Sequence, residues 1–342
     1  MRKFYALDSC YLIAEIGVNH NGDMKLAKNM IDAAKSSGAD AVKFQTFKAE
    51  SLVTHGTPKV AYQESTTQNQ ETHFEMLKKL ELSEIQHKIL KKYCDQNNID
   101  FISTPYDPKS VDFLEKLNVR QYKIASADIV DHVLLRRVAL TGKPVMISVG
   151  MATLEEIEDA LRIFSKYDAD DIILLHCVSN YPCSFEALNL KVIKTLQSTF
   201  RHPVGYSDHS IGSQASSLSI ALGAKVIEKH FTLDKLLPGP DHKASSSPKE
   251  FMELKQAIDQ AELILGSEFK ECQPEEKQMS QISRKSIVLS KNMKKGEEIK
   301  RSDLIMMRPG YGLRAKIIED LIGKILLKNL KKHSLLNLDD LK

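Results

Sequence analysis

Long apolar runs, cysteine pairs and a signal-like start are missing from this sequence of 342 residues, and each absence excludes a class of protein. No apolar run approaches the ~18–20 residues that a membrane-spanning helix needs, and the first residues lack the apolar core of a signal peptide. The five cysteines are scattered and none forms a Cys-x-x-Cys pair, which argues against a disulfide framework and against a zinc knot. We therefore expect a cytoplasmic protein with no membrane partner.

An excess of one charge and glycine-rich phosphate loops are missing as well. Lys and Arg number 48 against 45 Asp and Glu, a net charge of +3, which is too balanced for electrostatic binding of a nucleic acid. No P-loop or Rossmann glycine motif occurs in the sequence, so neither ATP nor NAD is expected as a ligand. The chain is 42% hydrophobic and 27% charged, a globular composition that excludes wholesale disorder.

From residue 11 to about residue 265, short β-branched runs alternate with amphipathic segments of helical period. This alternation is typical of βα units around a parallel sheet. Eight such units favour a TIM (β/α)8 barrel, with an open doubly wound sheet as the alternative. The predicted strands are residues 11–17, 41–47, 100–105, 122–126, 144–150, 171–178, 203–209 and 225–231.

Polar segments and a tail interrupt this rhythm. Residues 48–72 and 233–247 are long polar segments after the second and eighth predicted strands, and such loops often act as functional lids or crossings. Within the tail, residues 291–304 align with 328–341 at a spacing of 37 residues, which predicts two related hairpins. We therefore predict a catalytic barrel over residues 1–265, a linker over 266–283 and a small β-rich domain over 284–342.

Polar side chains cluster at the C-terminal ends of the predicted strands. In a TIM barrel these ends converge on one mouth, where active sites lie, and an unpaired charge is costly to bury elsewhere. Ordinary solvent-exposed strand ends would explain any one of these residues, but not a set that spans nearly every strand. The residues are Glu15, Lys43, Gln45, Thr104, Lys123, Ser126, Ser148, Ser207, Asp208, His209, Glu228 and His230.

Two histidines in this set, His209 and His230, end consecutive predicted strands. Two imidazoles with water and substrate oxygens suit a divalent ion such as Mn²⁺, Mg²⁺ or Zn²⁺, and hydrogen-bonded core histidines are the alternative. The neighbouring Asp208 and Glu228 are candidates for partners of the metal ligands or for acid/base groups.

Two lysines in the set, Lys43 and Lys123, are accompanied by several hydroxyl groups. Such a combination suits a small, multiply charged anion that carries a phosphate and a carboxylate. A Schiff-base aldolase lysine is the competing interpretation, since TIM barrels host that chemistry too. A Schiff-base lysine usually has apolar surroundings, so the hydroxyl groups favour anion binding.

Short motifs lie at the strand ends and in the loops that follow them. They are 15–22 (EIGVNHNG), 43–46 (KFQT), 103–105 (STP), 122–126 (YKIAS), 148–151 (SVGM), 181–182 (YP), 205–209 (GYSDH), 228–231 (EKHF) and 239–242 (GPDH). In this order they resemble the motifs of the sialic acid synthase family. The resemblance covers essentially the whole chain, and the tail, with 284–286 (RKS), 294–296 (KKG) and 308–310 (RPG), is similar to the family's C-terminal antifreeze-like (SAF) domain.

The resemblance implies an enzyme that condenses phosphoenolpyruvate with an N-acyl hexosamine, releasing phosphate and forming a nine-carbon 2-keto sugar acid. It further implies a domain-swapped homodimer and a divalent metal, Mn²⁺ first with Mg²⁺ or Co²⁺ as alternatives, held by His209 and His230. The implied catalytic residues are Glu15, Glu228 and His230. The implied phosphoenolpyruvate ligands are Lys43, Thr104, Lys123, Ser126, Ser148, Ser179 and Ser207. The implied amino-sugar ligands are Gln45, Asp128, Tyr181, Asp241 and, from the partner's SAF domain, Arg308.

Local departures from the family pattern bear on the acceptor more than on the reaction. Asp128 has a shorter reach than the glutamate found there more often, and Ser179 stands where some members have asparagine. The motif 239–242 resembles the N-acetylneuraminate and legionaminate branches more than the pseudaminate branch. We expect N-acetylmannosamine as the acceptor, with legionaminate synthesis from a di-N-acetylated dideoxyhexose as the alternative. The alternatives from other classes are a Lys-dependent aldolase and a non-catalytic sugar-binding protein.

Overall fold

The computed structural model describes residues 4–60, 63–64, 67 and 71–342. These residues form two compact units, Met1–Gly266 and Ser267–Lys342, and each is described by itself. No helix in the described part of the chain has the length and apolar character needed to cross a membrane.

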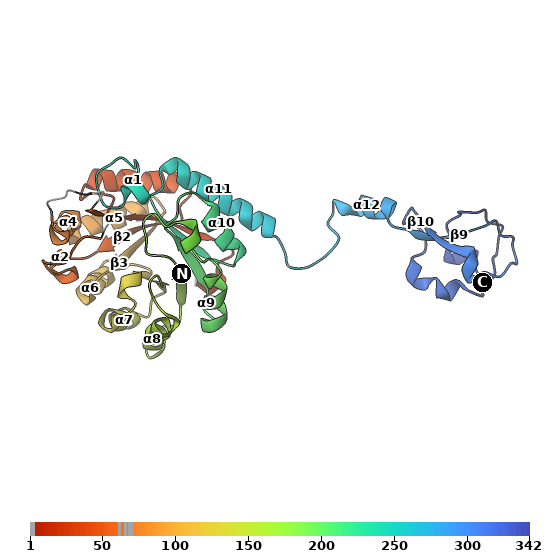
Figure 1. The fold of residues 1–342 in the computed structure, drawn as a ribbon, viewed down its shortest axis with the longest axis horizontal. Coiled ribbons are helices and arrows are strands. Elements are labelled where there is room, and N and C mark those ends of the chain that lie inside the picture. The colour runs from red at the N-terminus through yellow and green to blue at the C-terminus, as the bar shows by residue number, and fades with distance from the viewer. Residues whose placement is uncertain (1–3, 61–62, 65–66, 68–70) are drawn as a thin grey trace. The chain divides into compact units, whose positions relative to one another are not determined.

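The first unit is a barrel of parallel strands (Figure 1). Its hydrogen-bonded order is β3-β2-β1-β8-β7-β6-β5-β4, and the two end strands, β3 and β4, lie side by side, so the sheet is nearly closed. The predicted TIM barrel is therefore confirmed, and the open doubly wound sheet is wrong. The strands are β1 (Tyr11–Gly17), β2 (Ala41–Thr46), β3 (Asp100–Pro105), β4 (Tyr122–Ile124), β5 (Val145–Ser148), β6 (Ile172–His176), β7 (Val204–Asp208) and β8 (Val226–His230).

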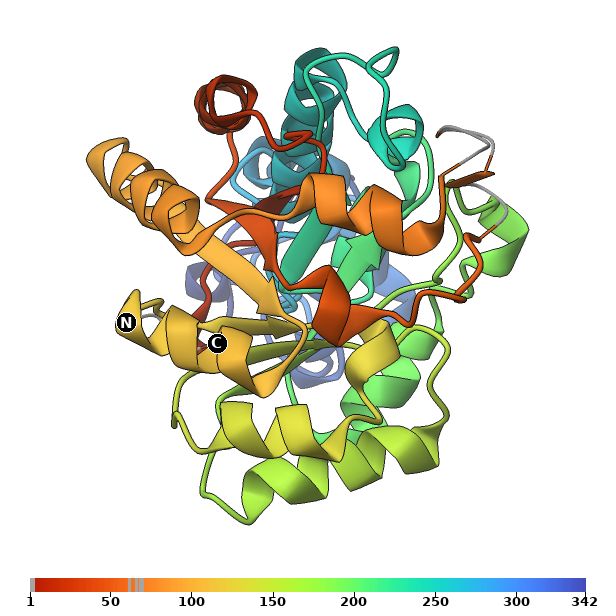
Figure 2. The same ribbon diagram turned by 90° about the vertical axis from the view of Figure 1, so that its left-hand side faces the viewer.

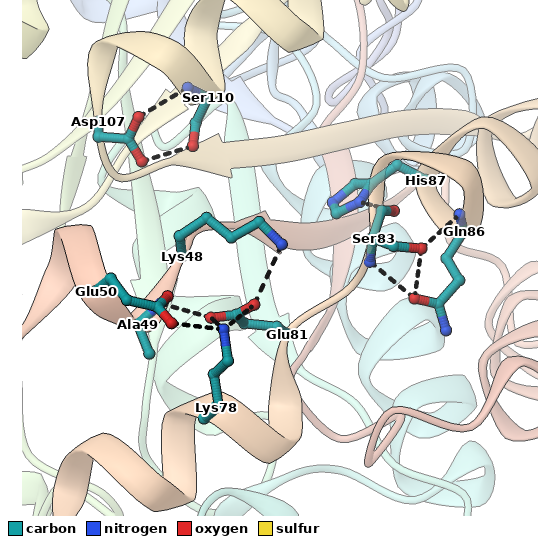
Figure 3. Close-up of polar contacts among 10 residues, drawn as sticks. All are labelled: Lys48, Ala49, Glu50, Lys78, Glu81, Ser83, Gln86, His87, Asp107 and Ser110. Atoms are coloured by element: carbon teal, nitrogen blue, oxygen red, sulfur yellow. Dashed lines mark hydrogen bonds and ion pairs between the residues drawn. The ribbon is translucent and has the colours of Figure 1, made fainter.

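A ring of helices covers the outside of the barrel, and its apolar faces pack on the strands to form the main core. Several of these helices begin at capping side chains, such as Ser83, which exchanges hydrogen bonds with Gln86, and Asp107, which accepts from Ser110 (Figure 3). The helices of this unit are α1 (Met24–Ser36), α2 (Ala49–Leu52), α4 (His73–Leu80), α5 (Glu84–Gln96), α6 (Pro108–Lys116), α7 (His132–Ala139), α8 (Leu154–Ser165), α9 (Val192–Phe200), α10 (Gln214–Ala221) and α11 (Pro248–Leu265).

The observed strands overlap all the predicted ones, but most end earlier. The strand predicted over residues 122–126 ends at Ile124, and Ser126 begins the 3₁₀ turn η2 (Ser126–Asp128). The polar segment predicted over 48–72 contains α2 near its start. Part of that segment, residues 61–62, 65–66 and 68–70, lies outside the described residues.

The second unit contains helix α12 (Glu276–Ser283), within the predicted linker, and the antiparallel strands β9 (Ser286–Leu289) and β10 (Leu304–Met307). The predicted duplication is visible as matching contacts 37 residues apart. Lys291 pairs with Asp303 at 2.7 Å, and the equivalent Lys328 pairs with Asp340 at 2.5 Å. The amides of Met293 and Leu330 each donate to the other's carbonyl at 2.9 Å. The two repeats therefore make the same internal contact and pair with each other through equivalent residues.

Candidate active site

A cavity of about 410 Å³ opens at the C-terminal ends of the barrel strands, where the sequence predicted a site. The predicted site residues of the barrel line this cavity, with the exceptions of Asp128 and Asp208. The lining residues that were predicted are Glu15, Lys43, Gln45, Thr104, Lys123, Ser126, Ser148, Ser179, Tyr181, Ser207, His209, Glu228, His230 and Asp241.

The strand period explains why these side chains meet. Successive residues of a strand point to opposite faces, so alternate residues enter the barrel. On β7 and β8, Ser207 and Glu228 are register partners, and their side chains hydrogen-bond inside the barrel with Ser207 Oγ 3.0 Å from Glu228 Oε1. His209 and His230, two residues further along, also face the cavity.

Two lysines and two glutamates form a buried cluster at the floor of the cavity. Lys43 Nζ lies 3.0 Å from Glu15 Oε2 and 3.5 Å from Glu228 Oε2, and Lys123 Nζ lies 3.7 Å from Glu228 Oε1. All four side chains are nearly inaccessible to solvent. Charges this deep persist only when they compensate each other, so the protonation of each member depends on its distances to the others.

The two glutamates of the cluster differ in protonation. Burial, reinforced by the charge of Glu228, raises the pKa of Glu15 to about 7 despite the opposing effect of Lys43. Burial also disfavours the charged form of Glu228, but Lys123, Lys43 and the Ser207 hydroxyl outweigh it and lower its pKa to about 2. At neutral pH Glu228 is therefore ionised, whereas Glu15 is present in both its protonated and its ionised form.

The two lysines differ as well. Burial opposes the charge of Lys43, but Glu15 and Glu228 outweigh it and raise its pKa. Burial lowers the pKa of Lys123, and the more distant Glu228 only partly offsets this effect. A bound anion would supply Lys123 with the counter-charge that the protein provides incompletely.

Hydroxyl and thiol groups line the adjoining wall around Gly150. The amide of Gly150 donates to Ser126 Oγ at 3.0 Å, and this oxygen lies 3.1 Å from Cys177 Sγ. A Cβ at Gly150 would approach Ser179 Oγ to 2.5 Å, so only glycine fits among these groups. Ser148 Oγ is buried and has no hydrogen-bond partner among the described residues. Its unused hydrogen-bonding capacity fits an incoming anionic oxygen.

The rings of His209 and His230 lie near that of Tyr181, and all three residues line the cavity. The ring centroids of His209 and His230 are 5.7 Å apart, and Tyr181 lies 4.1 Å from His209. Burial lowers the pKa of His209 to about 4 and that of His230 well below its usual value, so both rings are neutral at pH 7. Neutral imidazole is the form that binds metals.

The nitrogen atoms of these rings fit a divalent ion. His209 Nδ1 lies 2.7 Å from the carbonyl of Val178. Because a carbonyl only accepts, Nδ1 carries the proton and Nε2 keeps its lone pair. His230 Nδ1 is buried and has no hydrogen-bond partner in the described part of the chain. The described residues contain no group of three or more His, Cys, Asp or Glu suited to a metal, so the candidate set is these two histidines.

Helices α2 and α4 supply an apolar wall that the sequence interpretation missed. The cavity is lined by Leu52 at the end of α2 and Val53 directly after it, by Met76, Leu77 and Leu80 of α4, and by Val18 from the loop after β1. Figure 2 shows α4, in orange, in front of the strand ends. The signal available in the sequence was the capping box at Thr72 and Glu75, which starts an amphipathic helix directly after the polar segment.

Ion pairs fix α2 and α4 against each other (Figure 3). Lys78 Nζ lies 2.8 Å from Glu50 and 3.2 Å from Glu81, and Glu81 accepts from the Ala49 amide at 2.6 Å. Lys48 adds a contact of 3.1 Å to Glu81. Lys48, Glu50 and Lys78 are largely exposed, so the network orients the wall more than it stabilises the fold.

Two of the residues considered for the site, Asp208 and Asp128, are not among those that line the cavity. Asp208 lies on the outer face of β7, where it pairs with Lys229 at 2.8 Å, so the acid/base role considered for it is wrong. Asp128 is not among the lining residues. Burial, followed by the charge of Asp131, raises the pKa of Asp128 to about 7. Arg308 belongs to the second unit, where its Nε donates to the carbonyl of Ser283 at 2.9 Å.

Comparisons with known proteins agree on the family. The NeuB family matches residues 30–270 and the SAF domain matches residues 284–342. The chain is 45% identical over 326 residues to N,N'-diacetyllegionaminic acid synthase of Legionella pneumophila, covering 94% of this chain and 92% of the relative. It is 44% identical to the enzyme of the same name from Campylobacter jejuni, with 95% and 98% covered.

Relatives of lower identity are named for other product acids. Pseudaminic acid synthase of Helicobacter pylori is 34% identical, with 96% of this chain and 97% of the relative covered. Human N-acetylneuraminate-9-phosphate synthase is 35% identical, with 93% and 89% covered. The crystal structure of the N-acetylneuraminic acid synthetase of Leptospira borgpetersenii matches with a TM-score of 0.71 at 38% identity, covering 80% of this chain and 90% of that one.

The family match spans most of the barrel and the whole tail, and the relatives align along nearly the entire chain. This chain therefore belongs to the NeuB family of sialic acid synthases, enzymes of carbohydrate biosynthesis that form a carbon–carbon bond, and carries the SAF domain at its C-terminal end.

Proposed function

We propose that this enzyme condenses phosphoenolpyruvate with a di-N-acetylated dideoxyhexose, forming N,N'-diacetyllegionaminic acid and releasing phosphate. The relatives named for this product are 44–45% identical to the chain, whereas those named for pseudaminate or N-acetylneuraminate-9-phosphate are 34–35% identical. The legionaminate alternative is thus better supported than the N-acetylmannosamine acceptor expected from the sequence.

The observation that carries the reaction is the buried cluster of Lys43, Lys123, Glu15 and Glu228. In the proposal, the two ammonium groups bind the carboxylate and phosphate of phosphoenolpyruvate. The hydroxyls that surround the cluster complete this site: those of Thr104, Ser126, Ser148, Ser179 and Ser207. Charge-assisted hydrogen bonds in a water-poor cavity are stronger than those in water, which suits a ligand that carries several negative charges.

The two glutamates have different roles in the proposed reaction: Glu228 stabilises positive charge and Glu15 transfers protons. C3 of phosphoenolpyruvate attacks the aldehyde carbon of the open-chain sugar, and positive charge develops on C2, which bears the phosphate. The ionised Glu228, whose pKa is about 2, supplies negative charge near this carbon. Water then adds to C2, and the hemiketal phosphate collapses with cleavage of the C–O bond. Glu15, whose pKa is about 7, is suited to accept and return the protons of these steps.

His209 and His230 are proposed to hold a divalent metal, Mn²⁺ first. When bound, such an ion acts as a Lewis acid on the aldehyde oxygen of the acceptor. Tyr181, whose ring lies 4.1 Å from that of His209 and 5.5 Å from that of His230, limits how far the two imidazoles can turn. The chain's own contribution is thus two neutral ligands in a restrained orientation.

The apolar wall suits an acceptor that has fewer hydroxyl groups than N-acetylmannosamine. An acceptor deoxygenated at C6 presents a methyl group where N-acetylmannosamine has a hydroxymethyl, and the methyl of a second N-acetyl group adds further apolar surface. Val53, Met76 and Leu77 offer such a sugar apolar contact, whereas a hydroxyl buried against them without a partner loses about 1–3 kcal/mol. We expect this wall to favour the dideoxy acceptor by about 10- to 100-fold in kcat/KM.

The active form is proposed to be a homodimer in which the SAF domain of one copy serves the barrel of the other. Arg308 would then contact the acyl group of the acceptor. This assignment comes from the family resemblance, and it makes acceptor binding depend on assembly.

The test is a phosphate-release assay with phosphoenolpyruvate, Mn²⁺ and one acceptor at a time. Release is expected with the di-N-acetylated dideoxyhexose and is expected to stop when any component is omitted. Release with N-acetylmannosamine and not with the di-N-acetylated dideoxyhexose would overturn the proposed acceptor and indicate synthesis of N-acetylneuraminate.

Borohydride trapping with pyruvate tests the aldolase alternative in the same preparation. A covalent adduct at Lys43 or Lys123 would overturn the condensation chemistry, because a Schiff base requires one of these lysines as a nucleophile. Lys229→Met protein is a suitable control for labelling at other buried lysines, since Lys229 lies outside the cavity.

A further inference from the structure

A buried ion pair on the outer face of the barrel joins the two strands that carry the histidines. Lys229 Nζ lies 2.8 Å from Asp208 Oδ2, and both side chains are almost completely buried. Ser216 of α10 donates to Asp208 Oδ2 at 2.6 Å, and the Ser210 hydroxyl donates to Oδ1 at 2.7 Å. Both oxygens of the Asp208 carboxylate are thus hydrogen-bonded, as a buried charge must be to persist.

The register places this pair directly behind the active site. Asp208 of β7 and Lys229 of β8 are partners in the parallel ladder, and Ser207 and Glu228 are the partners just before them. Because side chains alternate between faces, Ser207, His209, Glu228 and His230 enter the cavity while Asp208 and Lys229 leave it. Each member of the pair therefore lies between two active-site residues in the sequence.

His209 lies beyond the last residue of β7, so the ladder does not hold it. Beyond the end of β7, Asp208 and Lys229 hold the backbone at Ser210, the residue after His209. The Ser210 amide donates to Asp208 Oδ1 at 2.8 Å, and Lys229 Nζ donates to the Ser210 carbonyl at 2.7 Å. The residues on both sides of His209 are thereby tied to each other and to the residue that precedes His230.

We infer that Asp208 and Lys229 are positioning residues that set the separation of His209 and His230, and through it the affinity for a divalent ion. The inference rests on the proposed metal site. Neither residue touches the cavity, so their effect passes through the backbone at 208–210 and 229–230. Residues that orient metal ligands from behind typically change metal affinity by about 10- to 100-fold.

The experiment uses the full chain, freed of metal and titrated with Co²⁺ alone, with visible absorption as the signal. Lys229→Met is expected to raise the Kd for Co²⁺ about 10-fold or more and to change the intensity of the absorption band, because it removes the link to Ser210. The remaining carboxylate keeps its hydrogen bonds from Ser210 and Ser216, which supports folding of the variant.

A matched pair of serines separates positioning from general loss of stability. Ser216 and Ser219 are both fully buried in α10, but Ser216 donates to Asp208 whereas Ser219 donates to the Ser216 carbonyl. Ser216→Ala is expected to weaken Co²⁺ binding by a smaller factor than Lys229→Met, and Ser219→Ala is expected to leave it unchanged.

Wild-type Co²⁺ affinity in Lys229→Met, or equal affinities in the two serine variants, would overturn the inference even if melting temperatures fall. If Lys229→Met does not fold, the serine pair decides alone. A His209→Ala variant that binds Co²⁺ like the wild type would instead overturn the metal site itself, so the two failures are distinguishable.

Discussion

The pKa shifts of Glu15 and Glu228 have opposite signs, which predicts that their glutamine variants change stability in opposite directions. Burial favours the neutral form of Glu15. The stability that this preference contributes to the folded state is therefore fully present below pH 4.5, and it is lost as the pH rises through the folded-state pKa of about 7. Glutamine keeps the shape of the neutral carboxyl and does not titrate. Glu15→Gln is therefore expected to stabilise the barrel above pH 7.

The magnitude follows from the interval between the two pKa values. For Glu15, the step from 4.5 to about 7 corresponds to about 3 kcal/mol at about 1.4 kcal/mol per pH unit. Glu15→Gln should match the wild type near pH 4.5 and exceed it by about 3 kcal/mol at pH 8. It should also lose activity, because the proton-transferring group is gone.

Glu228 provides the matched control, because its pKa is lowered to about 2. Its contribution is present above pH 4.5 and is lost as the pH falls through about 2, so Glu228→Gln should be less stable than the wild type by about 3 kcal/mol at pH 8. The assay is urea unfolding followed by circular dichroism at pH 5 and pH 8. Loss of stability at pH 8 in both variants would refute the division of roles between the glutamates.

Three further predictions address the ligands. Lys123→Met should raise the KM for phosphoenolpyruvate about 10- to 100-fold, since a hydrogen bond to a charged group is lost; an equal rise in the acceptor KM would contradict its placement. Chelation with EDTA should abolish phosphate release and Mn²⁺ should restore it, whereas activity that survives exhaustive chelation would contradict the roles of His209 and His230. Arg308→Ala should raise the KM of the acceptor much more than that of phosphoenolpyruvate, and equal changes would contradict the contact proposed across subunits.

Much of the site was predictable because two regularities act together. Parallel strands of a barrel end at one mouth, and alternate residues of a strand enter the barrel. A polar residue at the end of an apolar strand is therefore informative, as Lys43, Lys123 and Glu228 illustrate. The same alternation places Asp208 on the outer face, and adjacency to His209 was a misleading reason to consider it as an acid/base group.

The remaining features depend on distances that no pattern in the sequence encodes. Whether Glu15 or Glu228 is ionised depends on how closely each approaches the two lysines. The positions of these four residues in the sequence do not give those distances. The apolar wall depends on α4 crossing the mouth, so Met76 and Leu77 have the pattern of ordinary core residues until the fold is known. The link from Lys229 to Ser210 likewise joins residues 19 positions apart.

Direct competition between acceptors tests the central claim most closely. The wild-type enzyme is given phosphoenolpyruvate, Mn²⁺ and equimolar N-acetylmannosamine and di-N-acetylated dideoxyhexose, and the products are counted by mass spectrometry at low conversion. We predict that N,N'-diacetyllegionaminic acid exceeds N-acetylneuraminic acid by about 10-fold or more. Equal products, or an excess of N-acetylneuraminic acid, would contradict the proposed acceptor.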